Sequence, residues 1–264
     1  MTMIIDIHTH CFPDTLAPRA IAILKEKSGI PVYTDGTVNN LKISMKTAGI
    51  DICVLQPIAT KPEQTTNINR WAIDVQDDGI VSFGTIHPEF AGWKEEIKYL
   101  AASGIKGIKL HPEYQDFYVD DPKLYPIYEA LFTEGLFVLF HAGVDLGYTG
   151  PYHCTPSRLA NVLDSFPGAK IIAAHMGGYR YWEDVEKYLV GREICLDTSF
   201  TYNDLGPEAM VSIIKNHGTG KILFGTDSPW TDQSREVANI RSLDLSSEDL
   251  ALILGGNATG LLAL

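Results

Sequence analysis

The stretch from Gly104 to Phe140, GIKGIKLHPEYQDFYVDDPKLYPIYEALFTEGLFVLF, contains one complete strand–helix–strand pattern. Two short apolar runs, 104–110 and 136–140, stand at its ends, and a helical pattern occupies 121–135 between them. Short runs rich in Ile, Val, Leu and Phe and bounded by turn residues are typical of buried parallel strands. We therefore interpret this stretch as one unit of an α/β fold.

The same unit recurs on both sides of this stretch. Six further apolar runs are predicted as strands, at 3–8, 51–56, 80–86, 170–174, 193–198 and 221–226. Helical patterns lie between strands, for example at 92–103 and 157–167, and Gly104, Gly135 and Gly168 are placed as helix-ending residues. The long connection after the first strand has room for a helix and a loop.

Eight strands that alternate with helices in 264 residues predict a (β/α)8 TIM barrel, formed as a single domain over residues 1–264. A doubly wound open sheet is the alternative. No predicted strand is followed by the G-x-G-x-x-G pattern that such a sheet often carries, so we favour the barrel.

Composition narrows the function classes. The net charge of −12 offers no basic stripe for phosphates, so we expect no nucleic-acid partner. The sequence contains no signal-peptide pattern and no apolar run of membrane-spanning length, so we expect a cytoplasmic protein with no membrane partner. Its four cysteines form no C-x-x-C pair, which argues against a thiolate metal site.

Histidines gather where the predicted strands end, at the edge where barrel enzymes build their active sites. Six of the eight histidines stand there, joined by one lysine and one aspartate: His8, His10, His87, His111, His141, His175, Lys109 and Asp227. Scattered surface histidines would have no reason to choose that edge. His8 and His10 are separated by one residue, so both project from the same face of the first strand.

Imidazole and carboxylate donors of this kind suit a first-row divalent ion. Zinc is expected first, and Mn or Fe is compatible with the same nitrogen and oxygen ligands. A catalytic ion of this kind lowers the pKa of bound water to about 7 and so makes hydroxide available near neutral pH.

The ordered set of motifs DIHTH, GIKGIKLHPEYQ, FVLFHAG, IIAAHMGG, ILFGTDSPW and ILGGNATGLL resembles the amidohydrolase superfamily. The resemblance covers essentially the whole chain and is to the amidohydrolase-related branch that includes aminocarboxymuconate-semialdehyde decarboxylase. It implies that His8, His10, His141 and Asp227 bind the metal. It also implies that His175 acts as an acid/base or carbonyl-polarising group, or elsewhere in the superfamily as a ligand of a second metal.

Lys109 raises the question of one metal or two. In binuclear members of the superfamily a lysine is carboxylated and bridges the ions, but the I-K-L-H-P context is also common in the mononuclear branch. We favour one metal. The chain also departs from the decarboxylases of the branch: it is shorter, and it has no arginine between Arg19 and Arg70 to hold a substrate carboxylate.

Two enzymatic functions follow from the same site. The first is a metal-dependent hydrolase in which activated water attacks an amide, ester or lactone carbonyl, Asp227 takes the proton and His175 polarises the carbonyl or protonates the leaving group. The alternative is a non-oxidative decarboxylase in which His175 or hydroxide delivers a proton to carbon. The missing arginine and the shorter chain favour hydrolysis. A third hypothesis is a barrel that binds a ligand without turnover.

Substrate contacts are predicted for four side chains near strand ends, Lys109, His111, Arg180 and Trp230. The expected partner is a small-molecule substrate, and a homodimer is a common state for this fold family. His87, in an H-P-E turn, is interpreted as a structural residue.

Overall fold

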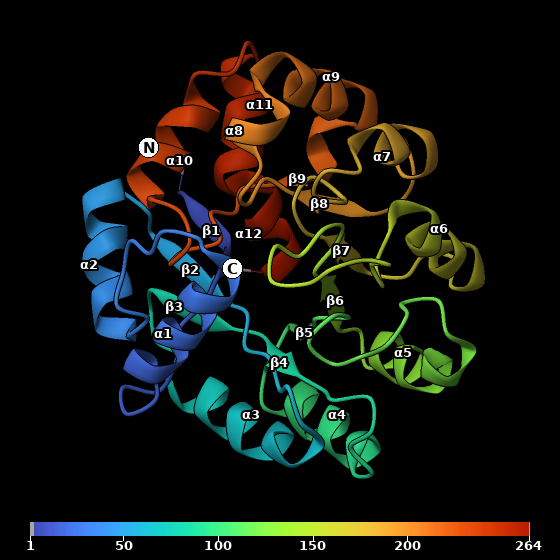
Figure 1. The fold of residues 1–264 in the computed structure, drawn as a ribbon. Coiled ribbons are helices and arrows are strands. Elements are labelled where there is room, and N and C mark those ends of the chain that lie inside the picture. Colours follow the sequence, from blue (N-terminus) through green and yellow to red (C-terminus); the bar gives the residue numbers. More distant parts are fainter. Residues whose placement is uncertain (1–2, 264) are drawn as a thin grey trace. The chain divides into compact units, whose positions relative to one another are not determined.

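Figure 1 shows the ribbon of the computed structural model, which describes residues 3–263. The chain divides into two units. The first unit comprises residues 3–55, 77–81 and 197–263 of the described chain, and the second comprises 56–76 and 82–196. Each unit is built from parallel strands and helices, and each is described in turn.

In the first unit, β1 (Ile5–Thr9) pairs in parallel with β2 (Ile52–Leu55), and β2 lies next to β3 (Ile80–Ser82). β1 is buried along its whole length, as expected for a strand covered on both faces. Near the other end of the sequence, Thr198 N donates to Leu223 O at 3.0 Å and so links the end of β8 (Cys195–Asp197) to β9 (Ile222–Leu223).

The helices of the first unit follow the strands in the sequence. They are α1 (Ala17–Ser28), α2 (Val38–Ala48), α8 (Tyr202–Leu205), α9 (Pro207–His217), α10 (Gln233–Arg241), α11 (Ser247–Ala251) and α12 (Asn257–Leu262), with a π-helical turn at Leu252–Gly256. The long connection predicted as one helix and a loop therefore holds two helices, α1 and α2. α2 begins at Thr37, whose side chain accepts a hydrogen bond from Asn40 N.

The second unit is a parallel series in which each strand pairs with the next along the chain. β4 (Gly84–Thr85), β5 (Gly107–Leu110), β6 (Phe137–Phe140), β7 (Ile171–Ala173) and β8 are adjacent in that order. The helices α3 (Thr65–Asp74), α4 (Trp93–Ala102), α5 (Tyr125–Thr133), α6 (Pro156–Ser165) and α7 (Trp182–Tyr188) alternate with them.

The strand and helix predictions hold for this alternation. Gly104 and Gly135 directly follow the C-cap residues of α4 and α5, as predicted, whereas α6 ends at Ser165 and Gly168 lies in the turn beyond its C-cap, Phe166. Gly104, Gly135 and Gly168 have φ values of 83°, 73° and 79°, in the left-handed region that favours glycine. None of the helices in the described chain is long and apolar enough to span a bilayer.

The predicted strand 80–86 is wrong in its extent, because the structure breaks it at Phe83 into β3 and β4. The hydroxyl of Ser82 donates to the carbonyl oxygen of Phe83 at 2.9 Å, which gives that carbonyl a partner outside the ladder. The Phe83 ring is fully buried and lies over Gly107, where an added Cβ would approach it to 2.5 Å. The break is therefore a packed feature of the second unit.

The predicted strand 221–226 is also too long, since β9 ends at Leu223. Beyond that residue, side chains supply hydrogen-bond partners to the backbone of Gly225 and Thr226 in place of a strand ladder. Thr198 Oγ1 pairs with both the N–H and the carbonyl oxygen of Gly225 at 3.1 Å, and the Asp6 carboxylate accepts from Thr226 N at 2.9 Å.

Candidate metal centre

The first unit brings His8, His10 and Asp227 together where β1 ends. The Nε2 atoms of His8 and His10 lie 3.6 Å and 3.1 Å from Asp227 Oδ1, and one donor atom from each residue lies within 4.8 Å of the others. Thr9, between the histidines, points the other way, and its hydroxyl donates to Val54 O at 3.0 Å. The alternation of a strand thus puts both imidazoles on the face that Asp227 approaches.

Asp227 reaches this position through backbone contacts with β1. Its N–H donates to His8 O at 2.8 Å, and Ser228 forms an isolated parallel bridge with Thr9. Asp227 itself has a φ of 68°, which is uncommon for a residue other than glycine. Backbone strain of this kind is held in place by surrounding contacts and is concentrated at functional sites. The carboxylate faces the imidazoles of His8 and His10.

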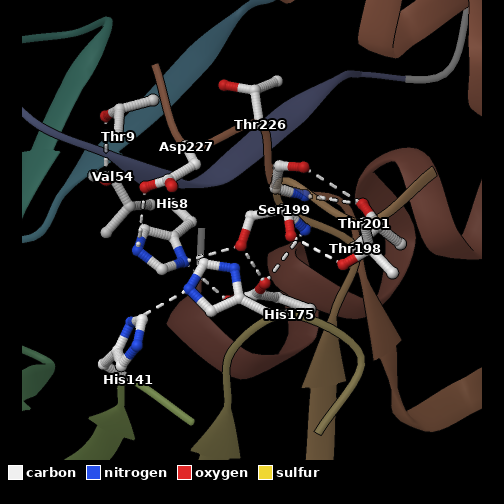
Figure 2. A network of polar contacts seen from close by, with 12 residues as sticks. His8, Thr9, Val54, His141, His175, Thr198, Ser199, Thr201, Thr226 and Asp227 are labelled. Carbon is white, nitrogen blue, oxygen red and sulfur yellow. Dashed lines mark hydrogen bonds and ion pairs between the residues drawn. The ribbon is translucent and has the colours of Figure 1, made fainter. Parts of the chain in front are cut away.

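The second nitrogen of His8 has protein partners that determine which nitrogen carries the proton. Nδ1 lies 2.9 Å from Asp197 Oδ2 and 3.0 Å from the Ser199 hydroxyl. Figure 2 shows the contact with Ser199. A carboxylate only accepts, so Nδ1 carries the proton and Nε2 keeps its lone pair toward Asp227. A carboxylate–histidine pair of this kind orients imidazole ligands in metal sites.

Asp197 and Ser199 were not among the predicted site residues. The available signal was the predicted strand 193–198, which contains Asp197 near its end, as the other strands contain their histidines. Asp197 Oδ1 accepts from Ser199 N at 3.0 Å and from the Ser199 hydroxyl, and both residues are fully buried. His8, Asp197 and Ser199 are therefore hydrogen-bonded to one another.

A second buried carboxylate, Asp6, lies on the same strand two residues before His8. It accepts from the Thr226 hydroxyl at 2.6 Å, from Gln233 Nε2 at 2.8 Å and from the His8 backbone N–H at 3.2 Å. Burial raises the pKa of Asp6 to about 7 in spite of these hydrogen bonds. Asp6 ties β1 to the segment that carries Asp227.

In the second unit, His141 follows β6 directly and is buried. Its Nδ1 lies 3.1 Å from Nε2 of His175, which follows β7 (Figure 2). Its Nε2 has no hydrogen-bond partner among residues 3–263. Burial, reinforced by His111 and His175, holds the pKa of His141 well below its usual range, so the ring is neutral. A buried neutral imidazole with an unpartnered nitrogen is a prepared metal ligand.

His175 has a φ of 59°, and Met176 beside it has a φ of 53°. Two successive left-handed residues turn the chain sharply at the end of β7. Trp182 Nε1 donates to His175 O at 3.3 Å and holds this turn. Backbone strain therefore occurs at both residues that were predicted to be catalytic, His175 and Asp227.

His111 follows β5 and is packed face to face between two rings. Its centroid lies 3.8 Å from that of Tyr114 and 4.2 Å from that of His141, with interplanar angles of 13° and 10°. Its Nε2 lies 3.3 Å from Asp145 Oδ2. One donor atom from each of His111, His141 and Asp145 lies within 4.8 Å of the others, which makes a second group with metal-type donors.

The other predicted substrate residues have different surroundings. Lys109 is fully buried on β5, between Thr85 and Leu139 of the neighbouring strands. Arg180 is exposed and lies over the Tyr179 ring at 5.1 Å. Trp230 is half-buried, and its backbone N–H donates to Asp227 O at 2.8 Å.

His87 is a turn residue in the second unit. Its Nδ1 accepts from Glu89 N at 3.2 Å, a local contact of the kind expected for a structural role.

The donors fit a divalent cation. His8, His10 and Asp227 offer two imidazole nitrogens and a carboxylate oxygen, a set that zinc, manganese and iron accept. His141 adds one more nitrogen of the same kind from the second unit. That His141 joins the other three at one metal stays a prediction, as do the substrate roles of Lys109, His111, Arg180 and Trp230.

Comparison with solved structures shows the fold. The chain matches 5-carboxyvanillate decarboxylase from Sphingomonas paucimobilis over 100% of both chains, with a TM-score of 0.74 and 16% identity. It matches a dihydroxybenzoic acid decarboxylase from a Polaromonas species, solved with bound manganese, over 100% of this chain and 98% of that one, at a TM-score of 0.73 and 17% identity. The third match is an uncharacterised TIM-barrel protein from Bordetella bronchiseptica, at a TM-score of 0.74 and 20% identity, covering 99% and 98%.

These full-length matches show that the chain has the TIM-barrel fold, as predicted. No curated protein matches it in sequence. The family model described as amidohydrolase matches residues 5–264, nearly the whole chain. The family inferred from the strand-end motifs is thus confirmed, and this chain belongs to the amidohydrolase family.

Proposed function

We propose that this protein is a metal-dependent carboxy-lyase that removes carbon dioxide from an aromatic or otherwise unsaturated carboxylate. The observation that carries the metal dependence is the group formed by His8, His10 and Asp227. The Nδ1 atom of His8 is bound to Asp197, so its remaining nitrogen faces the Asp227 carboxylate as a ligand would. A histidine that only fills a core does not need one nitrogen held by a carboxylate and the other turned toward a second carboxylate.

The preference for decarboxylation over hydrolysis rests on the solved structures. Those named 5-carboxyvanillate and dihydroxybenzoic acid decarboxylase act on aromatic carboxylates, as their names state, and both match this chain over essentially its full length. The shorter chain and the missing arginine favour hydrolysis, with decarboxylation as the alternative. We now give the alternative first place.

The reaction requires that one C–C bond break and one C–H bond form. A carboxylate, R–COO⁻, and a proton give R–H and CO2. A bound divalent cation supplies positive charge that orients the substrate oxygens and withdraws electron density. In this proposal His8, His10, His141 and Asp227 hold the cation, and His175 delivers the proton to the carbon that loses CO2.

We propose that Lys109, which is buried, and Arg180, which is exposed, supply positive charge near the substrate carboxylate. Trp230 and His111 are proposed to shape the substrate site together with them. Manganese in the dihydroxybenzoic acid decarboxylase structure supports testing that ion together with zinc and iron. The partner is a small molecule, and a homodimer is the assembly we propose.

Hydrolysis is kept as the second candidate because the matching family model is described as amidohydrolase. In that reaction Asp227 takes the proton of the attacking water, and His175 polarises the carbonyl or protonates the leaving group. The two reactions use the same donors but differ in whether water is consumed.

The test is a turnover experiment with metal-stripped protein reloaded with Mn²⁺ or Zn²⁺. A panel of hydroxybenzoates and related aromatic carboxylates is incubated in D2O, CO2 release is recorded, and NMR is used to locate deuterium in the product. A matched panel of amides, esters and lactones is followed in H2¹⁸O. We expect CO2 release with one deuterium at the carbon that carried the carboxylate.

The metal-site variant Asp227→Asn should abolish this activity. Asp78→Asn is the matched control, because Asp78 is exposed and stands outside the metal-type donor groups. Incorporation of ¹⁸O into hydrolysis products, with no CO2 from any carboxylate, would support the hydrolase instead. Full activity in protein freed of metal would exclude both proposals.

A further inference from the structure

Tyr114, His111 and His141 form a stack of rings in the second unit, and the substrate role proposed above for His111 does not account for that stack. We propose that Tyr114, His111 and Asp145 are positioning residues that fix the ring plane of His141, so that its Nε2 is presented as a metal ligand. This inference rests on the proposed function for its use of the metal, but its geometry stands independently.

The rings form an almost parallel column. His111 lies between Tyr114 and His141 at centroid distances of 3.8 Å and 4.2 Å, with planes within 13° and 10°. Aromatic pairs of this kind restrict each other's side-chain rotation because a turned ring would collide with its neighbour. One face of the His141 ring is therefore set by His111.

His111 is itself anchored at both ring nitrogens. The backbone N–H of Tyr114 donates to His111 Nδ1 at 3.4 Å, and Glu113 Oε2 lies farther from the same nitrogen, at 3.8 Å. The shorter contact makes Nδ1 the acceptor and places the ring proton on Nε2. That Nε2 lies 3.3 Å from Asp145 Oδ2. Asp145 is held in turn by Gly147, whose N–H donates to Oδ1 at 2.7 Å.

The contacts of His111 bear on whether it binds a metal itself or supports His141. His111, His141 and Asp145 could hold a second cation by donor type. A metal at His111 Nε2 would move the ring proton to Nδ1, where it would face the Tyr114 N–H at 3.4 Å. Glu113 Oε2, at 3.8 Å from Nδ1, lies beyond hydrogen-bond distance. The hydrogen bonds therefore favour His111 as support for His141 over His111 as a ligand.

The two ring nitrogens of His141 have different surroundings. Its Nδ1 is paired with His175 Nε2 at 3.1 Å, and its Nε2 is the atom without a partner among the described residues. The stack sets the plane of the ring, and His175 sets its orientation within that plane. Only Nε2 is then available to a cation, which matches the orientation that supporting residues impose on histidine ligands.

The test uses three variants. Tyr114→Ala removes the outer ring, Tyr114→Phe keeps a ring of the same shape, and Tyr99→Ala is the matched control. Tyr99 belongs to the same unit but is exposed, and its ring lies under Arg70 at 3.6 Å. Two quantities are measured on metal-stripped protein: the Kd for Mn²⁺ by titration calorimetry, and the ¹⁵N shifts of the His141 ring after selective histidine labelling.

We expect wild-type His141 to show a single Nδ1–H tautomer. Tyr114→Ala should give averaged ¹⁵N shifts and a Mn²⁺ affinity lower by about ten-fold, which is the lower end of what loss of a supporting partner costs a metal site. Tyr114→Phe should restore both quantities, and Tyr99→Ala should change neither. If Tyr114→Ala does not fold, Asp145→Asn releases His111 at nearly constant volume and should shift both quantities in the same direction.

Wild-type His141 shifts and affinity in both Tyr114→Ala and Asp145→Asn would overturn the inference while leaving the proposed function intact. Failure of the proposed function alone would give a different result. If wild-type protein binds no Mn²⁺ or Zn²⁺ but the His141 shifts still change in Tyr114→Ala, the positioning role stands and the proposed function fails.

Discussion

The Asp197 carboxylate contacts His8 Nδ1 and so determines which nitrogen of His8 carries the proton. Its Oδ2 accepts the Nδ1 proton of His8 at 2.9 Å, and both side chains are almost completely buried. The negative charge of Asp197 raises the basicity of the opposite nitrogen, which faces Asp227. A neutral amide at this position keeps the shape and loses the charge.

Asp197→Asn should therefore weaken Mn²⁺ or Zn²⁺ binding by about 10- to 100-fold while leaving the protein folded. Calorimetric titration of metal-stripped protein gives the affinity, and circular dichroism checks the fold. Asp78→Asn, an exposed position, serves as the control. Unchanged affinity in Asp197→Asn would mean that His8 is not a ligand supported by this carboxylate.

At the residue scale, the sequence predicted donors better than it predicted their support. His8, His10 and Asp227 could be grouped because strand-end position is readable from apolar runs and turn residues. Asp197 and Ser199 were missed although the strand before them was predicted. Their role depends on which atom faces His8 Nδ1, and that is determined by packing between segments almost 190 positions apart in the chain.

At the level of elements, the end of β6 depends on one close backbone approach. Gly143, two residues after His141, pairs with Tyr179 in a parallel bridge, and its N–H donates to Cys154 O at 2.8 Å. A Cβ at this position would lie 2.2 Å from Tyr179 N and 2.4 Å from Tyr179 O. Its φ of 88° is also unfavourable for any other residue.

Gly143→Ala should therefore destabilise the protein by roughly 2–4 kcal/mol, because the backbone of Tyr179 cannot move aside as a flexible side chain can. Urea denaturation gives the free energy of unfolding. Gly220→Ala is the matched control, since an added Cβ there meets nothing within 4 Å. Equal stability of the two variants would show that the 143–179 contact is not maintained in solution.

The pattern of apolar residues predicts the order of the strands better than it predicts their lengths. The order of strands and helices was predictable because each buried strand is a short apolar run closed by turn residues. The lengths of 80–86 and 221–226 were overestimated. The Ser82 hydroxyl donates to Phe83 O, the Thr198 hydroxyl donates to Gly225 O, and the Asp6 carboxylate accepts from Thr226 N. Hydrophobic patterns carry no information about these side-chain contacts.

At the scale of the whole molecule, the net charge of −12 opposes the approach of a carboxylate substrate. Local positive charge has to compensate for this at the site. A divalent cation held by the predicted donors would supply it where the substrate must bind, and the buried Lys109 would add to it. The metal therefore carries two roles in the proposal, in substrate binding and in chemistry.

A cation that binds the folded chain and not the unfolded one should also stabilise the entire protein. At a free concentration one hundred times its Kd, the expected gain is about 2.7 kcal/mol. For a domain of this size that corresponds to a rise of about 5–10 °C in Tm. Thermal unfolding of metal-stripped protein with and without Mn²⁺ measures the shift.

His10→Ala should lose most of this rise in Tm, because His10 Nε2 lies 3.1 Å from Asp227 Oδ1 in the group that would hold the ion. The control Asp78→Asn should retain the rise. A Tm rise of the same size in His10→Ala as in the wild type would place the stabilising ion elsewhere and remove the main support for the proposed centre.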